Sequence, residues 1–289
     1  MSGAAPSLTL AERLTRARTD LVAAGVHEAD ASVDVDVYAR EILGWDRARL
    51  LSEQRAKAPA TLEPRFSEMV ARRAKREPTA YIVGRRDFWN LSFRVSPAVL
   101  IPRPETEFIV EEALSLLRDI PSARVADIGT GSGCLAISIA HEVPTCTVLA
   151  TDISQDALDV ALDNAMTNGV ADRVTFVCTS YLDDVGGTFD VVVANPPYVR
   201  QIDKAALGKD VRHEPDVALF GGADGLRDIA GVLDAGLAAL APGGWFLMEF
   251  GYGQEADVRR LVAERPGLNL NGLRSDLQGI PRTAVLRRV

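Results

Sequence analysis

The sequence predicts an α/β protein: a doubly wound, mostly parallel sheet of seven strands, with a helical domain at the N-terminus joined to it by a β-hairpin. Three observations support this prediction. From residue 124 onward, apolar strand segments alternate with helical segments. Before residue 80, apolar residues recur only at helical spacing. Between these two parts, the aromatic segment 88–95 has the pattern of a short hairpin.

The N-terminal part is expected to contain three helices. Their apolar stretches end near Gly25, Gly44 and a basic run at 72–76, and Thr61 is the expected N-cap of the third helix. The basic run has two interpretations. It is either a solvated face that complements the helix C-terminus, which is the simpler reading, or a surface that docks a partner.

The remaining chain is expected to supply the sheet. Strands are predicted at 125–129, 146–152, 174–178, 189–194, 244–250, 268–273 and 283–288. Helical segments lie between most of them, and a further helix begins at Glu105. Such alternation produces parallel strands with helices on both faces of the sheet. We therefore expect a helical domain at 1–84, a hairpin linker at 85–100 and the α/β domain at 101–289.

Composition narrows the possible functions. The 289 residues include 32 Lys and Arg against 40 Asp and Glu, a net charge of −8. Residues 1–80 carry 13 basic and 12 acidic residues, and the remaining residues carry 19 and 28, a difference that supports a boundary near residue 80. Generic binding to a phosphate backbone needs clustered positive charge, so it is disfavoured.

Cysteine and histidine usage argues against a metal site. Cys134, Cys146 and Cys178 form no CxxC pair, and the three histidines do not cluster with them. Free thiols suit a reducing cytosol, so we expect a cytoplasmic protein. No apolar stretch approaches the ~18 residues of a spanning helix, so no membrane segment is expected.

A glycine-rich loop follows the first predicted strand. It holds, in this order, Asp127, Gly129, Thr130, Gly131, Ser132 and Gly133. Glycine lets the backbone take positive φ and approach a ligand, although a tight strand–helix turn would need glycine as well. A dinucleotide fingerprint would require glycine at position 134, where this chain has Cys134. The spacing favours a ligand without a pyrophosphate at the loop, and S-adenosylmethionine fits.

Asp152 ends the second predicted strand, 25 residues after Asp127. A carboxylate there can accept hydrogen bonds from both ribose hydroxyls of an adenosyl group. The alternative is that Asp152 caps the following helix, a role for which Ser154 competes. The glycine loop upstream favours ribose binding.

The segment Asn195, Pro196, Pro197, Tyr198 follows the apolar strand FDVVVA and is the most specific signal in the chain. The prolines fix the backbone and remove two donors. The Asn195 side-chain oxygen and the Pro196 carbonyl can then converge on the hydrogens of a planar NH₂ group, with Tyr198 against its face. This arrangement suits methylation of an amide or of an exocyclic amine of a base. The alternative is a rigid exit from the strand.

These motifs resemble those of class I S-adenosylmethionine-dependent methyltransferases, and more narrowly the bacterial release factor glutamine methyltransferases of the HemK/PrmC family. NPPY alone is shared by N-methyltransferases with several kinds of substrate, whereas LIPRPETE with an N-terminal helical domain is far more specific. The resemblance covers nearly the whole chain. Its segments are PTAYIVG, FWNLSFRV, LIPRPETE, DIGTGSGCLAISIA, NPPYV, EPDVALFGGADGL and DLQGIPR.

The resemblance implies a substrate, the glutamine of the GGQ motif in class-1 peptide release factors, methylated at N5 with S-adenosyl-L-homocysteine as the other product. It places the loop from Gly129 to Gly133 on the cofactor, Asp152 on its ribose and Tyr181 near its adenine. Asn195, Pro196, Pro197 and Tyr198 would bind the substrate, with Asn195, Pro196 and Tyr198 in the catalytic roles and Asn195 also beside the cofactor.

Arg103 and Glu105 either line the entrance to the active site or anchor the segment between the domains. The runner-up activities are glutamine methylation of a ribosomal protein and amine methylation of a nucleic acid. Residues 1–84 are expected to dock the release factor, because a pocket around one side chain offers less than the ~800 Å² per partner of a specific interface. We expect a monomer without direct contact to nucleic acid or membrane.

Overall fold

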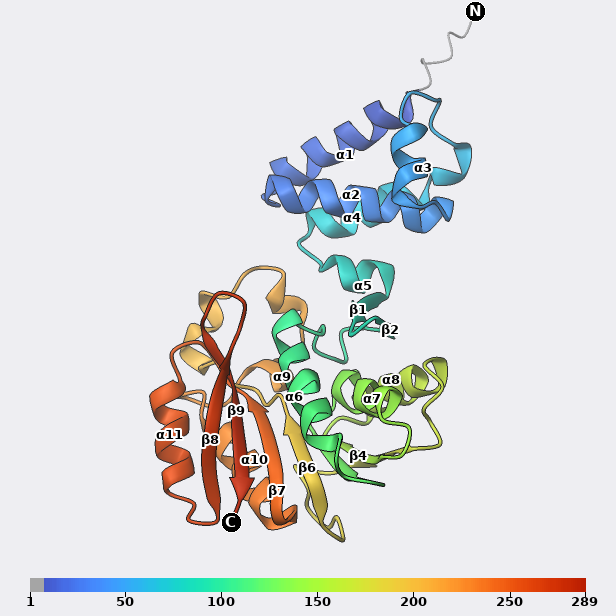
Figure 1. Cartoon of the computed structure of the whole chain (residues 1–289). Helices are drawn as coiled ribbons and strands as arrows, with labels where there is room; N and C mark the ends of the chain where they lie inside the picture. Colours follow the sequence, from blue (N-terminus) through green and yellow to red (C-terminus); the bar gives the residue numbers. More distant parts are fainter. Residues whose placement is uncertain (1–7) are drawn as a thin grey trace, which may run out of the picture. The chain divides into compact units, whose positions relative to one another are not determined.

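The structure is a computed structural model that describes residues 8–289 (Figure 1). The chain divides into two compact units. Unit 1 comprises the residues up to 84 together with 209–213, and unit 2 comprises 85–208 and 214–289. No helix in the described part of the chain is long and apolar enough to span a membrane.

Unit 1 is helical. Its elements are α1 (Leu10–Ala23), α2 (Glu28–Leu43), α3 (Arg47–Ser52), η1 (Ala60–Leu62), α4 (Arg65–Ala74), α5 (Thr79–Val83) and η4 (Val211–His213). Thr9 caps α1 in a reciprocal pair of hydrogen bonds with Glu12. Thr61 does not cap the third long helix as predicted, because it lies within the short turn η1 and α4 begins only after Pro64.

The basic run at 72–76 is partly buried in unit 1. Arg73 is 5% exposed and donates to Asp34 at 2.6 Å and to Asp210 at 2.9 Å. Arg76 donates to Asp210 at 2.6 Å. The interpretation as a solvated face is therefore wrong for Arg73, because a buried guanidinium needs carboxylate partners of this kind. These two arginines bind the 209–213 segment into unit 1.

Unit 2 contains a two-stranded hairpin and a seven-stranded sheet. Its strands are β1 (Arg85–Phe88), β2 (Leu91–Arg94), β3 (Arg124–Ile128), β4 (Thr147–Asp152), β5 (Val174–Cys178), β6 (Phe189–Ala194), β7 (Leu240–Glu249), β8 (Leu268–Ser275) and β9 (Pro281–Arg288). Its helices are η2 (Pro104–Thr106), α6 (Glu107–Leu117), α7 (Cys134–Glu142), α8 (Gln155–Thr167), η3 (Gln201–Ala205), α9 (Asp216–Leu219), α10 (Arg227–Ala239) and α11 (Glu255–Ala263).

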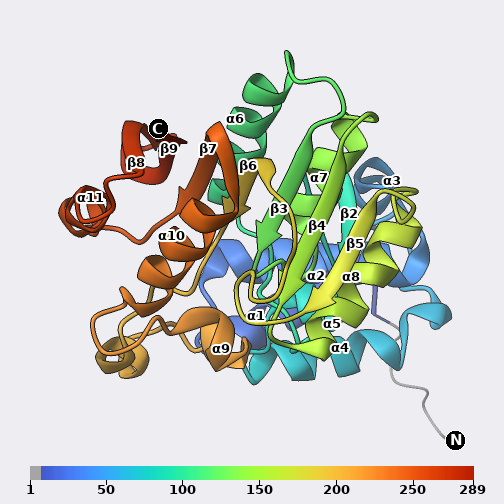
Figure 2. The same ribbon diagram turned by 90° about the horizontal axis from the view of Figure 1, so that it is seen from below.

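The seven strands lie in the order β5-β4-β3-β6-β7-β9-β8, and Figure 2 shows the first five side by side. The first five are parallel to one another, whereas β9 pairs antiparallel with both β7 and β8. The predicted fold class is confirmed. The sheet grows in opposite directions from β3, towards β4 on one side and β6 on the other. Such a switch point is where open α/β sheets bind ligands.

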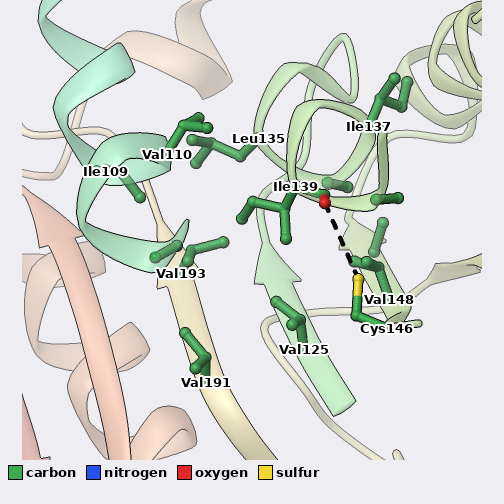
Figure 3. Close-up of a cluster of buried hydrophobic side chains, with 14 of the residues drawn as sticks. Ile109, Val110, Val125, Leu135, Ile137, Ile139, Cys146, Val148, Val191 and Val193 are labelled. Atoms are coloured by element: carbon green, nitrogen blue, oxygen red, sulfur yellow. Dashed lines mark hydrogen bonds between the residues drawn. The ribbon is translucent and has the colours of Figure 1, made fainter. Parts of the chain in front are cut away.

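Alternate residues of the strands feed two hydrophobic cores. Val125, Val191 and Val193 face helices α6 and α7 on one side of the sheet (Figure 3). Their neighbours Ala126 and Val192 face α10 and α11 on the other side. This alternation follows from the two-residue period of a strand. Because both faces of the sheet carry apolar side chains, helices pack on both sides of it. The sheet therefore provides a rigid base for the loops at its edge.

The hairpin packs within unit 2. Phe88 and Phe93 are buried in the same core as α6 and α7, with their rings edge to face at a centroid distance of 6.0 Å. Asn164 of α8 accepts a hydrogen bond from the Arg94 backbone N–H at 2.7 Å and donates to the Arg94 carbonyl at 3.0 Å. These contacts fix the segment that leads into the LIPRPETE motif.

Candidate active site

The candidate site lies along the carboxyl edge of the sheet. Ile128 is level with Thr151 on β4 and with Ala194 on β6, and Ala194 is level with Met248 on β7. The next residue of each strand or following loop is therefore placed at one edge. These residues are Gly129, Asp152, Asn195 and Glu249.

The glycine loop forms a cradle of backbone. Gly129, Gly131 and Gly133 have φ of +72°, +54° and +82°, a region that favours glycine. A Cβ on Gly129 or Gly131 would meet no atom within 4 Å, whereas a Cβ on Gly133 would lie 2.6 Å from Ile137 Cδ1. Gly133 thus lets helix α7 pack closely, and the other two leave room for a ligand to approach the main chain.

Asp127 holds this loop from below. Its Oδ2 accepts from Thr130 Oγ1 at 2.6 Å and from the Ala136 N–H at 3.1 Å, while its buried Oδ1 has no hydrogen-bond partner in the described structure. Burial raises the pKa of Asp127 to about 7, against the lowering effect of its two donors. The nearby carboxyl of Asp152 adds a smaller upward shift to this pKa.

Asp152 lies at the rim of the loop. Its Oδ2 accepts from the Gly131 N–H and its Oδ1 from the Ser154 N–H, each at 2.9 Å. Each oxygen retains a lone pair for a further donor. The helix cap at this point is Ser154, which accepts from the Ala157 N–H, so the alternative role for Asp152 as the cap is not what the structure has. Burial raises the pKa of Asp152.

Tyr181 belongs to the wall of the same space. Its hydroxyl donates to Asp228 at 2.8 Å, and its carbonyl accepts from Thr151 Oγ1 at 2.6 Å. A Cβ at Gly231 of α10 would lie 2.3 Å from the Tyr181 ring, so glycine at that position lets the ring pack on the helix. Burial and the Asp228 carboxylate raise the pKa of Tyr181 to about 12.

Asn195 is held by a chain of hydrogen bonds. Its Nδ2 donates to Thr106 Oγ1 at 3.0 Å, and Thr106 Oγ1 donates to Glu249 Oε2 at 2.7 Å. The Tyr198 hydroxyl donates to the other oxygen of Glu249 at 3.1 Å. Burial raises the pKa of Glu249, and the Thr106 and Tyr198 hydroxyls oppose that shift. No protein donor among residues 8–289 reaches Asn195 Oδ1 or the Pro196 carbonyl.

The backbone of the NPPY segment is held by hydrogen bonds and close packing with residues 219–225. Val199 donates to the Leu219 carbonyl at 2.9 Å and accepts from the Gly221 N–H at 3.0 Å. A Cβ on Gly221 would lie 2.4 Å from the Pro197 carbonyl oxygen, and one on Gly225 would lie 2.4 Å from that of Tyr198. Glycine at these two positions therefore permits the FGGADG loop to pack directly on the NPPY main chain.

Arg103 and Glu105 differ in their position relative to the cavity. Arg103 lines the cavity and donates to Glu214, whose second oxygen accepts from the Ile101 N–H at 3.0 Å. Arg103 thus lies at the cavity and is held there by Glu214 within unit 2. Glu105 does not line the cavity.

A cavity of about 330 Å³ joins these features within unit 2. Of the predicted site residues, those that line it are Gly129, Thr130, Gly131, Ser132, Asp152, Tyr181, Asn195, Pro196 and Pro197. Gly133 and Tyr198 do not line it; Gly133 packs against α7 and Tyr198 supports Glu249. Ligand cavities of ~300–1,000 Å³ are typical for small molecules.

The donor set fits an adenosyl cofactor. The open backbone at Gly129 and Gly131 and the buried Ser132 hydroxyl, which has no partner in the described structure, provide polar atoms for the cofactor's amino-acid end. The carboxylate of Asp152 suits two ribose hydroxyls. Within residues 8–289, no group of three or more His, Cys, Asp or Glu is arranged to hold a metal ion.

Sequence reasoning missed Thr106, Glu249, Asp228 and Glu214 as partners of the predicted residues. A signal existed for Glu249, because an acidic residue near the end of the apolar segment GWFLMEF is unusual for a buried strand. Thr106 lies within the LIPRPETE motif, but nothing in the motif says which of its residues faces Asn195.

Comparison with known proteins agrees with this geometry. Residues 107–215 match the family model "Methyltransferase small domain", and residues 12–84 match "PrmC N-terminal domain". The chain is 37% identical to the release factor glutamine methyltransferase of Bradyrhizobium diazoefficiens, over 97% of this chain and 93% of that protein. It is 42% identical to the same-named protein of Xylella fastidiosa, over 88% and 92%.

Among solved structures, the hMettl16 catalytic domain in complex with an RNA hairpin aligns with a TM-score of 0.57 at 16% identity, covering 76% of this chain and 80% of that one. A likeness at this identity concerns the methyltransferase fold alone.

We expect Asp127 to make stability fall as pH rises. Its pKa is about 7 in the folded protein and near 3.8 when unfolded, so the protonated form favours folding below pH 4 and this contribution is lost by pH 7. The shift is equivalent to roughly 4 kcal/mol. The side chain in Asp127→Asn cannot ionise. In urea unfolding, the free energy of unfolding of the variant should therefore rise relative to that of the wild type between pH 5 and pH 8. An equal difference at both pH values would contradict the raised pKa.

Proposed function

The chain belongs to the release factor glutamine methyltransferase family, and we propose that it methylates N5 of the glutamine in the GGQ motif of class-1 peptide chain release factors. It is an S-adenosylmethionine-dependent protein-glutamine methyltransferase. The observation that carries the proposal is the orientation of Asn195, whose Nδ2 donates one hydrogen bond to Thr106 Oγ1 while Oδ1 is left for a substrate. Methylation of a ribosomal protein or of a nucleic acid is not favoured.

The cofactor would be held by the loop from Gly129 to Ser132, by Asp152 at the ribose and by Tyr181 at the adenine. When bound, S-adenosylmethionine supplies a methyl group on a positively charged sulfur. The loop contributes main chain that a ligand can approach at Gly129 and Gly131, and Asp152 contributes a carboxylate whose two oxygens are already oriented by the N–H groups of Gly131 and Ser154.

The substrate amide is a poor nucleophile, because its nitrogen lone pair is delocalised into the carbonyl. Asn195 Oδ1 and the Pro196 carbonyl would accept its two N–H hydrogens and hold the nitrogen in line for attack on the methyl group. The same acceptors stabilise positive charge as it develops on nitrogen. Packing of Tyr198 on the amide plane has less support, because Tyr198 does not line the cavity and its hydroxyl is bonded to Glu249.

Residues 1–84 would dock the release factor. They match a family model of their own, and none of the residues placed in the cavity comes from them. A single glutamine side chain offers too little surface for a specific protein interface. Since the proposed substrate is a translation protein, we place the reaction in the cytoplasm.

Asp152→Ala should weaken binding of S-adenosylmethionine by ~1–3 kcal/mol, the range for hydrogen bonds to a charged group. Calorimetric titration measures this. Asp152→Asn is the matched control for loop shape, because its oxygen can still accept from one of the two backbone N–H groups. Unchanged affinity in the alanine variant would remove Asp152 from the ribose site.

Asn195→Ala should lower kcat for release-factor methylation by ~100-fold or more, as expected when one oriented transition-state contact is lost. Affinity for the cofactor should fall much less. Asn168→Ala is a suitable control, since Asn168 lies at the end of α8 and outside the cavity. The measurement is the transfer of a labelled methyl group to a release factor. A release factor whose GGQ glutamine is replaced serves as the second substrate and tests which residue is methylated. A near-normal rate for Asn195→Ala would overturn the NPPY mechanism.

A chain shortened to residues 85–289 should still bind S-adenosylmethionine but largely lose methylation of intact release factor. Shortening also removes Arg73 and Arg76, the partners of Asp210. The full chain carrying Asp210→Ala is therefore the control, because it breaks those ion pairs but keeps the helices. If the shortened chain retained full activity on the intact factor, docking by residues 1–84 would be wrong.

A further inference from the structure

Thr106 and Glu249 form a buried polar unit behind Asn195. Each is only 2% exposed. Thr106 Oγ1 lies 2.7 Å from Glu249 Oε2 and 3.0 Å from Asn195 Nδ2, so one hydroxyl bridges the carboxyl group and the amide. The three residues come from distant parts of the chain. Thr106 lies in the turn before α6, Asn195 in the loop after β6 and Glu249 at the end of β7.

The direction of these hydrogen bonds follows from chemistry. A hydroxyl has one hydrogen, and a carboxyl oxygen that carries no proton only accepts, so Thr106 donates its hydrogen to Glu249 Oε2. Its oxygen can then only accept when it meets Asn195. The Asn195 amide must therefore present its NH₂ to Thr106, which turns Oδ1 away from this unit. With the hydroxyl reversed, the amide could rotate by 180° and present NH₂ where the substrate amide needs an acceptor.

Stability alone does not account for Glu249. A carboxyl group is expensive to bury, and no Lys or Arg in the described residues forms an ion pair with this one. Its partners are two hydroxyls, those of Thr106 and Tyr198. An apolar residue at the end of β7 would avoid the desolvation. What the carboxyl group provides is an acceptor of fixed position beneath Thr106.

We propose that Thr106 and Glu249 are positioning residues, which set the orientation of the Asn195 amide so that Oδ1 accepts from the substrate amide. This rests on the proposed function, because the NH₂ group to be gripped is that of the substrate glutamine. Thr106 lines the cavity beside Asn195, whereas Glu249 does not line it, and neither is proposed to contact the reacting atoms. Their effect reaches the reaction through the rotational state of one side chain, and it should appear in kcat rather than in cofactor affinity.

The variants are chosen at Thr106. Thr106→Val keeps the shape and removes both hydrogen bonds, Thr106→Ala removes them with less bulk, and Thr106→Ser restores the hydroxyl. Thr283→Val is the matched control, since Thr283 is also fully buried, pairs with Glu249 in the sheet register and has a hydroxyl with no partner in the described structure. It should retain wild-type activity.

Two measurements are made on the full-length protein. In the first, kcat for methylation of a release factor should fall about tenfold or more in Thr106→Val and Thr106→Ala, the scale of one orienting hydrogen bond, and recover in Thr106→Ser. The dissociation constant of S-adenosylmethionine should change less than twofold. Wild-type kcat in both hydroxyl-free variants would overturn the proposal.

The second measurement needs no substrate. The side-chain NH₂ signals of Asn195, identified by their loss in Asn195→Ala, are followed by ¹⁵N NMR. They should shift towards solvent-like values in Thr106→Val and stay in place in Thr106→Ser and Thr283→Val. Unchanged signals in Thr106→Val would overturn the positioning role. If the wild type failed to methylate release factor, the proposed function would fall, while these signals would still decide the orientation of Asn195.

Discussion

The structure depends on one constraint: neighbouring parallel strands end at the same level, so the residues that follow them share an edge. Ile128, Thr151, Ala194 and Met248 form a level row across four strands. The site residues Gly129, Asp152, Asn195 and Glu249 each follow a residue of that row directly in the sequence. The helical layers on both faces hold the strands, and the strands hold the loops. Because order is imposed by backbone pairing, the site needs few contacts of its own to be precise.

Acidic side chains at this edge accept hydrogen bonds from hydroxyl and backbone N–H groups, and none of the three forms an ion pair with a basic side chain in the described residues. Asp127 accepts from a hydroxyl and a backbone N–H, Asp152 from two backbone N–H groups, and Glu249 from two hydroxyls. Such donors satisfy the carboxyl oxygens without a basic side chain, and burial raises the pKa of all three groups. Unit 1 shows the contrasting solution, in which Arg73 is buried between Asp34 and Asp210.

Much of this could be predicted from sequence because it is local. The glycine spacing, the acid at the end of a strand and NPPY after a strand each mark a loop at the carboxyl edge, and periodicity located all seven strands. The rest depends on tertiary contacts between distant segments. No local pattern links Thr106 to Asn195, 89 residues away, or Tyr181 to Asp228. Nor could periodicity reveal that residues 209–213 belong with the N-terminal helices, since Arg73 and Arg76 recruit them by charge.

Part of the chain's excess of acidic over basic residues lies at the candidate site. Residues after 80 carry 28 acidic against 19 basic side chains, and four of the acids, Asp127, Asp152, Asp228 and Glu249, surround the cavity or support its walls. A nucleic-acid groove would require the opposite sign. A cofactor with a positive sulfur, and a nitrogen that becomes positive as it is methylated, are both favoured by the carbonyl and carboxyl acceptors at this edge of the sheet. The feature that disfavours a polyanionic substrate thus suits methyl transfer to a neutral amide.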